Sequence, residues 1–173
     1  MSSKATLAQR VFNAAHLTGE FTLRSGIVSH EYFDKYQFES DPVLLRDICR
    51  EMVPLIPDDT DFLAGLEMGG IAIATVLSQL SGIPCLFVRK SAKEYGTAKF
   101  AEGPEYSGKR LTIIEDVVTS GGQIVLSHQD LISSGAICDQ AICALDREQG
   151  GREKLLEAGI TLTSVLRKSD FTA

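Results

Sequence analysis

The sequence predicts an α/β protein in which helices flank a central parallel sheet, and three observations support this prediction. Helix-like and strand-like segments alternate from about residue 40 onward, as they do in repeated βα units. The apolar run 111–114 is short and rich in β-branched residues, which is typical of a parallel strand buried on both faces. Asp41 and Pro42 supply an N-cap and a first-turn proline for a helix. The length of 173 residues fits one domain.

The individual elements follow from apolar runs that are bounded by turn residues. Strands are expected at 62–65, 84–88, 111–115, 137–145 and 161–165, and helices at 42–52, 69–80, 123–134 and 153–158. Residues 1–40 are expected to form a small N-terminal hood over the site, with a helix at about 6–16 and a hairpin through 21–23 and 32–38. Residues 41–173 then form the core of the single domain 1–173. The segment 89–109 shows no apolar periodicity, and a connection of that length is usually functional.

Composition and charge exclude several classes of function. The net charge of −6 gives no support for a nucleic-acid or membrane surface, because both would favour a basic face. No apolar run approaches the length of a transmembrane helix and the first residues lack the layout of a secretory signal, so a cytoplasmic location is expected. The cysteines and histidines show no metal-ligand spacing, so we expect no transition metal bound by protein ligands.

The segment 111–122 carries the clearest functional pattern, because an apolar strand leads into an acidic pair and a glycine-rich hydroxyl loop. Glu115 and Asp116 are expected at the carboxyl end of the strand, where open α/β sheets bind ligands, so their carboxylates can reach sugar hydroxyls. In the loop TSGG at 119–122 the hydroxyls can donate and the glycines permit tight turns. A helix that begins near Gln123 would offer free N–H groups to a phosphate. The pattern predicts a site for a phosphorylated ribose.

This order of strand, acidic pair and T-x-G-x loop resembles the phosphoribosyl pyrophosphate (PRPP) signature of the type I phosphoribosyltransferases. The resemblance implies the fold of that family, a central parallel sheet flanked by helices with a small N-terminal hood. It also implies that PRPP is bound by Glu115, Asp116, Val117, Val118, Thr119, Ser120, Gly121, Gly122 and Gln123. The segment 66–71, called here the pyrophosphate loop, would contact PRPP through the backbone of Met68 and Gly69. Gly69 stands where some members carry a lysine.

Three further segments resemble the orotate phosphoribosyltransferases within that family. The first comprises FTLRSG at 21–26 and the following Tyr32-Phe33-Asp34, which together match the amino-terminal motif. Arg24 replaces the lysine of that motif and keeps the positive charge that would meet PRPP. By the resemblance, Tyr32 and Phe33 line the orotate pocket.

The second segment, LDRE at 145–148, resembles the L-D-R-x-E segment after the last long strand of that family. The resemblance implies that Arg147 recognises orotate, which carries a carboxylate on a flat pyrimidine. A guanidinium fork matches a carboxylate in one plane, so an arginine suits this role better than a lysine. Thr119 is matched to an orotate contact as well.

The third segment, RKSAKEYG at 89–96, looks like the mobile catalytic loop of the same family. By the resemblance Lys93 is the main catalytic lysine, and the residues of this loop that bind PRPP are Arg89, Lys90, Lys93 and Tyr95. Three cations on one loop suit a pyrophosphate. Tyr95 stands where the family usually has a histidine, and a phenol with a pKa of about 10 does not titrate near neutral pH.

The resemblance implies a reaction of orotate with PRPP that gives orotidine 5′-phosphate and pyrophosphate in de novo pyrimidine nucleotide synthesis. Lys93, Glu115 and Asp116 would be the catalytic residues. Mg²⁺ is implied as the cofactor, held mainly through PRPP oxygens and water and not by protein ligands. A homodimer is implied too, in which the loop 89–103 reaches across the interface into the site of the partner subunit.

Two other functions stay open at this point. One is phosphoribosyl transfer to a different nucleobase, against which Arg147 and the segment 21–26 argue. The other is a PRPP-binding regulator without transfer activity. Such a regulator normally carries a DNA-binding appendage, and the sequence shows no basic helix-turn-helix segment. The intact loop around Lys93 also favours an enzyme with transfer activity over a regulator.

Overall fold

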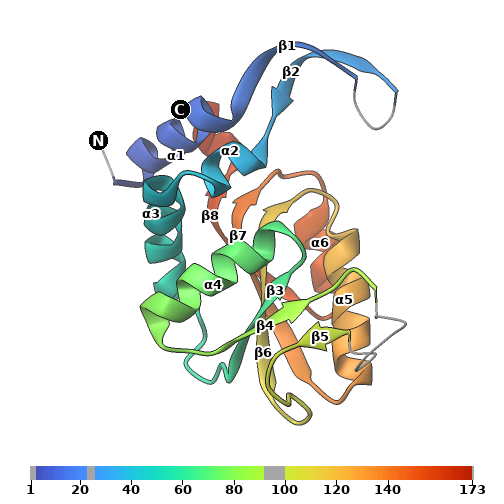
Figure 1. Ribbon diagram of the computed structural model, residues 1–173. Helices are drawn as coiled ribbons and strands as arrows, with labels where there is room; N and C mark the ends of the chain where they lie inside the picture. Colours follow the sequence, from blue (N-terminus) through green and yellow to red (C-terminus); the bar gives the residue numbers. More distant parts are fainter. Residues whose placement is uncertain (1–2, 23–25, 92–99, 173) are drawn as a thin grey trace.

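A six-stranded sheet forms the centre of the molecule, in the order β5-β4-β3-β6-β7-β8 (Figure 1). The strands are β3 (Phe62–Leu66), β4 (Cys85–Val88), β5 (Ala101–Glu102), β6 (Arg110–Val118), β7 (Ile137–Asp146) and β8 (Thr161–Arg167). The computed structural model describes residues 3–22, 26–91 and 100–172. All neighbouring strands are parallel except β5, which pairs antiparallel with β4. The parallel sheet is confirmed, and the connection without periodicity contains one short edge strand that was not predicted.

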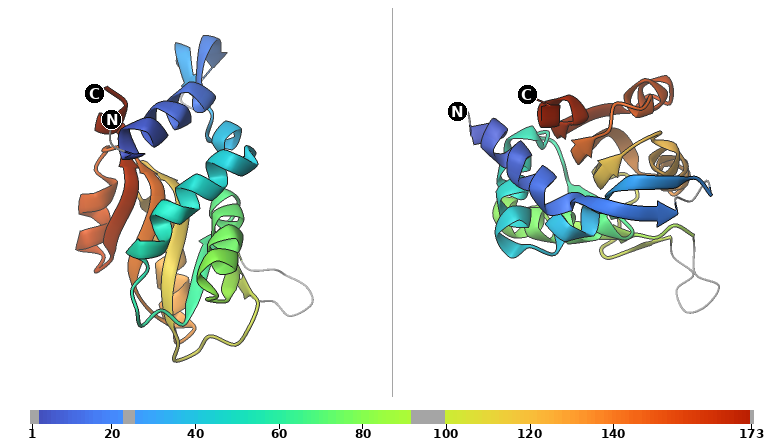
Figure 2. Two further views of the ribbon diagram at one scale, coloured as in Figure 1. Left: turned by 90° about the vertical axis from the view of Figure 1, so that its left-hand side faces the viewer. Right: turned by 90° about the horizontal axis from the view of Figure 1, so that it is seen from above.

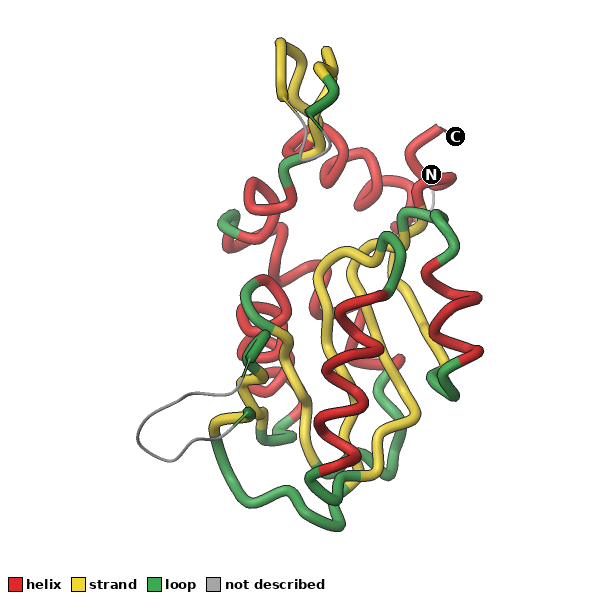
Figure 3. The backbone as a smooth tube through the Cα atoms, turned by 90° about the vertical axis from the view of Figure 1, so that its right-hand side faces the viewer, coloured by secondary structure: helices red, strands yellow, loops and turns green. Residues whose placement is uncertain are grey.

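Helices cover both faces of this sheet (Figure 3). The helices are α1 (Ser3–Ala15), α2 (Lys35–Glu39), α3 (Pro42–Met52), α4 (Gly69–Ser81), α5 (Gly122–Ser133) and α6 (Gly151–Glu157), with the short 3₁₀ turns η1 (Val53–Leu55) and η2 (Lys168–Thr172). Adjacent residues of β6 show the two layers: Ile114 packs in the core with α3 and α4, whereas Ile113 packs in the core with α5 and α6. None of the helices that the structure describes is long and apolar enough to cross a membrane.

The N-terminal hood consists of α1, the antiparallel hairpin β1 (His16–Thr22) and β2 (Val28–Phe33), and α2. Figure 2 shows the hairpin projecting beyond the core. The predicted continuation of the second strand to residue 38 is wrong. Asp34 accepts a hydrogen bond from the backbone N–H of Tyr36 at 3.1 Å and so caps α2, which turns the chain into a helix from Lys35 onward.

Strand β6 is longer than its apolar run predicted. It runs to Val118 because Val117 and Val118 pair with Leu145 and Asp146 at the end of β7. Glu115 and Asp116 therefore lie inside a paired strand and not after its end. Their backbone is fixed by the ladder, which restricts where their carboxylates can point.

Two neighbouring leucines of α6 test how the sheet face covered by α5 and α6 is stabilised. Leu155 is fully buried in the core with α5, whereas Leu156 is 68% exposed. We expect Leu155→Ala to lower the free energy of unfolding by about 2–5 kcal/mol, because it leaves a cavity. The matched change Leu156→Ala should stay within about 0.5 kcal/mol of the wild type. Urea unfolding followed by circular dichroism measures both, and equal losses would contradict this packing.

Candidate active site

A phosphate cradle, formed by residues 117–124, connects β6 to α5. These residues and Glu115 line a cavity of about 130 Å³. Gly121 adopts a left-handed backbone with φ of 69°, and a side chain there would approach the carbonyl oxygen of Gly151 to 3.1 Å. The N-cap residue of α5 is Gly121, so no side chain caps this helix. The first N–H groups of α5 are therefore available to bind an anion. The structure thus brings together the cradle residues that the sequence assigned to PRPP.

The acidic pair lies beside this cradle and forms a charged contact with the hood. The Asp116 side chain is 1% exposed, and its Oδ2 atom accepts a hydrogen bond from Nζ of Lys35 at 2.5 Å. Burial and the neighbouring charge of Asp116 raise the pKa of Glu115 well above its usual value. Burial opposes the ionisation of Asp116 too, but hydrogen bonds from Glu115 and Lys35 outweigh it and lower the pKa of Asp116. The two pKa shifts therefore have opposite directions, and Asp116 is the more acidic member of the pair.

A third carboxyl group, that of Glu39 at the end of α2, packs against the same contact. Glu39 is buried, and its Oε1 atom has no hydrogen-bond partner in the part of the chain that the structure describes. Burial raises the pKa of Glu39 to about 8, and the charge of Asp116 adds to this effect. Within this cluster the pKa values of Glu39 and Glu115 are raised and that of Asp116, the partner of Lys35, is lowered.

The pyrophosphate loop meets this cluster at the start of α4. A Cβ atom on Gly69 would lie 1.8 Å from Oδ2 of Asp116 and 2.8 Å from Oε1 of Glu39, so no side chain fits at position 69 in this arrangement. Met68, which precedes it, is 60% exposed, and the peptide bond between Glu67 and Met68 is cis. The two residues predicted as backbone contacts thus border the acidic pair.

The predicted catalytic loop is described only at its two ends. Nε of Arg89 lies 3.2 Å from Oε1 of Glu102, and the backbone N–H of Lys90 donates to Oε2 of Glu67 at 3.4 Å. The start of the loop is therefore linked to the pyrophosphate loop. Three residues assigned to the site, Arg24, Lys93 and Tyr95, lie outside the described residues.

The predicted orotate residues border a second and larger hollow, called here the base cavity. Its volume is about 500 Å³, and it is lined by Phe12, His16, Ser29, Glu31, Tyr32, Phe33, Arg147, Lys168 and Phe171. The guanidinium carbon of Arg147 lies 5.1 Å from the centre of the Phe33 ring, a cation–π distance. Thr119 borders the phosphate cradle and is absent from this lining.

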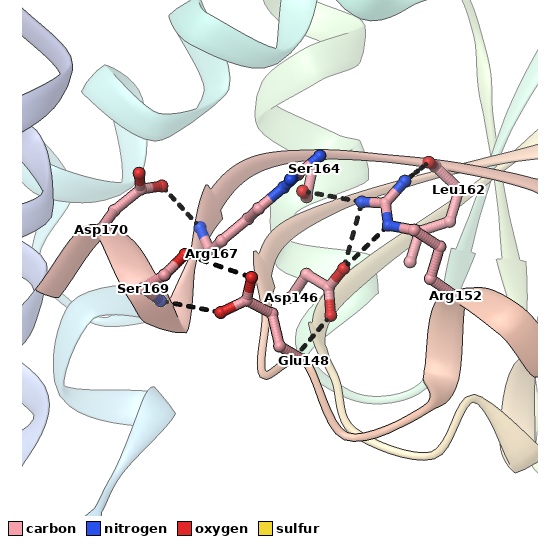
Figure 4. Close-up of polar contacts among 8 residues, drawn as sticks. All are labelled: Asp146, Glu148, Arg152, Leu162, Ser164, Arg167, Ser169 and Asp170. Atoms are coloured by element: carbon pink, nitrogen blue, oxygen red, sulfur yellow. Dashed lines mark hydrogen bonds and ion pairs between the residues drawn. The ribbon is translucent and has the colours of Figure 1, made fainter.

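A network of polar contacts holds the turn that carries Arg147 (Figure 4). The buried carboxylate of Asp146 accepts hydrogen bonds from the N–H of Glu148 at 2.9 Å and from Nη2 of Arg152 at 3.1 Å. Glu148 has a positive φ of 54°, and its carboxylate accepts hydrogen bonds from the N–H and the hydroxyl of Ser169. Arg147 itself donates its N–H to the carbonyl oxygen of Val118 at 2.8 Å. The carboxy-terminal 3₁₀ turn therefore helps to fix the orientation of Arg147.

Sequence reasoning missed Lys35, which lies in the predicted strand 32–38, and Glu39, which directly follows that strand. The spacing of Asp34 and Gln37 was an available signal, since an N-cap residue followed three positions later by glutamine is typical of a helix start. It also missed Lys168 and Phe171 in the base cavity. No local pattern marks these two residues, because tertiary packing alone brings the end of the chain to the hood.

The pKa of Glu39 predicts how stability depends on pH. Between about pH 5 and 8 the folded protein holds a proton on Glu39 that the unfolded chain has lost, so the free energy of unfolding falls as pH rises through this window. Glu39→Gln removes this contribution. As pH rises, the free energy of unfolding of Glu39→Gln should therefore fall less steeply than that of the wild type. The two slopes should differ by up to about 1.4 kcal/mol per pH unit. Denaturant unfolding at several pH values measures this difference. The exposed control Glu51→Gln should follow the wild type, and parallel curves for Glu39→Gln would contradict the assignment.

Comparisons with known proteins agree with this geometry. No family model matches the chain. A protein named orotate phosphoribosyltransferase from Nocardioides sp. is 51% identical over 173 residues, which cover 100% of this chain and 97% of the relative. Crystal structures of the Mycobacterium tuberculosis orotate phosphoribosyltransferase superpose with TM-scores of 0.88 in the complex with Fe(III) dicitrate and 0.83 in the complex with PRPP, at 28% and 26% identity. Each match covers 99% of this chain and 100% of the solved chain. With its cradle, acidic pair and base cavity, the chain belongs to the orotate phosphoribosyltransferase family.

Proposed function

We propose that this protein transfers the 5-phosphoribosyl group from PRPP to orotate, giving orotidine 5′-phosphate and pyrophosphate. The observation that carries the proposal is the placement, at one edge of the sheet, of a phosphate cradle, an acidic pair and a cavity that contains Arg147. The M. tuberculosis protein that shares this fold has been crystallised with PRPP, which supports the choice of phosphoribosyl donor. The same reaction would serve de novo pyrimidine nucleotide synthesis.

The cradle and the acidic pair divide the binding of PRPP between them. N–H groups at the start of α5 suit the 5-phosphate, since an uncapped helix N-terminus attracts anions. Glu115 borders the cradle, and Asp116 lies next to it in β6, so both carboxyl groups are available to the ribose hydroxyls. Mg²⁺ fits this arrangement as a partner of PRPP. PRPP oxygens and water would supply most of its ligands, since Mg²⁺ keeps much of its hydration shell.

Arg147 and the hood select the nucleobase in this proposal. The Arg147 guanidinium stays charged at any physiological pH, although burial lowers its pKa, and it can hold the orotate carboxylate in one plane. Tyr32 and Phe33, which belong to the hood, supply aromatic surface to the flat pyrimidine in the base cavity.

Cleavage of the bond between C1 and the pyrophosphate oxygen leaves positive charge on the ribose and negative charge on the leaving group. Hydrogen bonds between the ribose hydroxyls and the carboxyl groups of Glu115 and Asp116 hold the ribose in position, with Asp116 accepting, and cations must stabilise the pyrophosphate as it leaves. We assign this task to Lys93, with Arg24, Arg89, Lys90 and Tyr95 as further PRPP contacts. A cytoplasmic location and a homodimer that shares the loop 89–103 complete the proposal, and cell fractionation and sedimentation would test them.

One assay tests the function. Loss of orotate absorbance is followed with PRPP and Mg²⁺, beside parallel reactions with uracil, hypoxanthine and xanthine. We expect turnover with orotate alone. Turnover with another base would favour a different phosphoribosyltransferase, and PRPP binding without turnover of any base would favour a regulator.

Arg147→Ala should separate the two substrates, because Arg147 lines the base cavity and not the cradle. We expect the Kd for orotate to rise roughly tenfold to a hundredfold through the loss of charge-assisted hydrogen bonds, with the Kd for PRPP unchanged. Calorimetric titration of each ligand measures both constants. The exposed control Arg46→Ala should bind both ligands like the wild type. An equal loss of both affinities would mean that Arg147 is structural.

The shared loop predicts complementation between two inactive proteins. Lys93→Ala and Asp116→Asn subunits, mixed and allowed to exchange, should form heterodimers in which one site collects both changes and the other is intact. With random exchange half of the dimers are mixed, so recovery should approach about a quarter of wild-type activity. Mass spectrometry confirms the exchange. A confirmed mixture that stays inactive would place Lys93 in the site of its own subunit.

A further inference from the structure

The pyrophosphate loop, LEMGGI at 66–71, carries no cationic side chain of its own. At Gly69 a Cβ atom would lie 1.8 Å from Oδ2 of Asp116, so a side chain there would require Asp116 to move. The Oε1 atom of Glu39 lies 2.8 Å from the same point. Pyrophosphate carries several negative charges and approaches two carboxyl groups of β6, so this side of the site needs a cation from another segment.

Lys35 brings a cation to this place from the hood. Its Nζ atom lies 2.5 Å from Oδ2 of Asp116, the same oxygen that a side chain at position 69 would strike. The ammonium group of Lys35 and the space that a side chain at position 69 would occupy therefore both border Oδ2 of Asp116. Among the described residues, Lys35 is the cation that hydrogen-bonds to the acidic pair. Its side chain is 33% exposed, so it can also meet a ligand.

The surroundings of Lys35 favour a role beyond holding the hood to the core. Asp116 is 1% exposed, so its ion pair with Lys35 offsets the cost of a buried charge. The Lys35 side chain is itself only partly buried, so its ammonium group is also open to a second acceptor. The ribose hydroxyls compete for Asp116 in the proposed reaction, and any hydrogen bond they take weakens the hold of Asp116 on Lys35. A phosphate oxygen at this side of the ribose would then be the strongest acceptor within reach of the ammonium group.

We propose that Lys35 is a further PRPP-binding residue, which supplies to the pyrophosphate group the cation that the pyrophosphate loop lacks at Gly69. This inference rests on the proposed function of the site and adds to it a residue from the hood. It also connects α2 to catalysis, because the segment that follows the base-binding strand β2 contacts the leaving group.

Pyrophosphate and ribose 5-phosphate distinguish a direct contact from an indirect one. Each ligand is titrated calorimetrically with Mg²⁺ into the wild type and into Lys35→Met. A direct contact predicts that the Kd for pyrophosphate rises roughly tenfold or more, the effect of losing one charge-assisted hydrogen bond, while the Kd for ribose 5-phosphate does not rise. If Lys35 only positions Asp116, the reverse holds, because pyrophosphate has no ribose hydroxyls for Asp116 to bind.

Three controls make the outcome decisive. Lys35→Gln removes the charge but keeps a donor for Asp116, so it should lose pyrophosphate affinity even where Lys35→Met folds poorly. Lys109→Met removes a lysine that pairs loosely with Asp61 at the other end of β6, and it should bind both ligands like the wild type. If folded Lys35→Gln binds pyrophosphate with an unchanged Kd, the assignment of Lys35 is wrong while the proposed function of the site stands. A wild type that binds neither PRPP nor pyrophosphate overturns the proposed function and this inference together.

Discussion

The pairing of β6 with β7 is the constraint on which the site depends. The two strands stay in register to Val118 and Asp146, so Thr119 of the phosphate cradle and Arg147 of the base cavity leave the sheet side by side. The hydrogen bond from Arg147 N–H to the Val118 carbonyl oxygen continues this ladder for one more residue. The separation between the donor site and the nucleobase site is therefore set by a backbone ladder, which is stiffer than any side-chain contact.

Burial of carboxyl groups at the end of β6 imposes a second constraint. A buried charge is costly unless it is paired, and here three carboxyl groups share one lysine. The pKa values of Glu115 and Glu39 are raised and that of Asp116 is lowered, because hydrogen bonds from Lys35 and from the N–H of Val117 favour a charge on Asp116. The same crowding leaves no room for a side chain at position 69.

The parts of the structure that the sequence predicts are those encoded locally. Sheet strands appear as apolar runs, and the cradle appears as an acidic pair followed by hydroxyls and glycines within one segment. The strand predicted through residue 38 fails because the cap formed by Asp34 outweighs the apolar content of the segment that follows it. The two-residue strand β5 is too short to show a period. The contact of Lys35 with Asp116 joins residues 81 positions apart, and no spacing rule can indicate it.

The two halves of the site consequently differ in how they are built. The cradle is made by consecutive residues between a strand and a helix, so its geometry is complete once β6 and α5 have formed. The base cavity needs α1 and β2 of the hood to pack with the carboxy-terminal turn, and ring contacts of Phe171 with Phe12 and Phe33 at 5.5 and 5.8 Å join these three elements. Recognition of the phosphoribosyl donor is thus local and preorganised, whereas recognition of the base depends on tertiary packing. Substitutions in the hood can change the base that is accepted without disturbing the cradle.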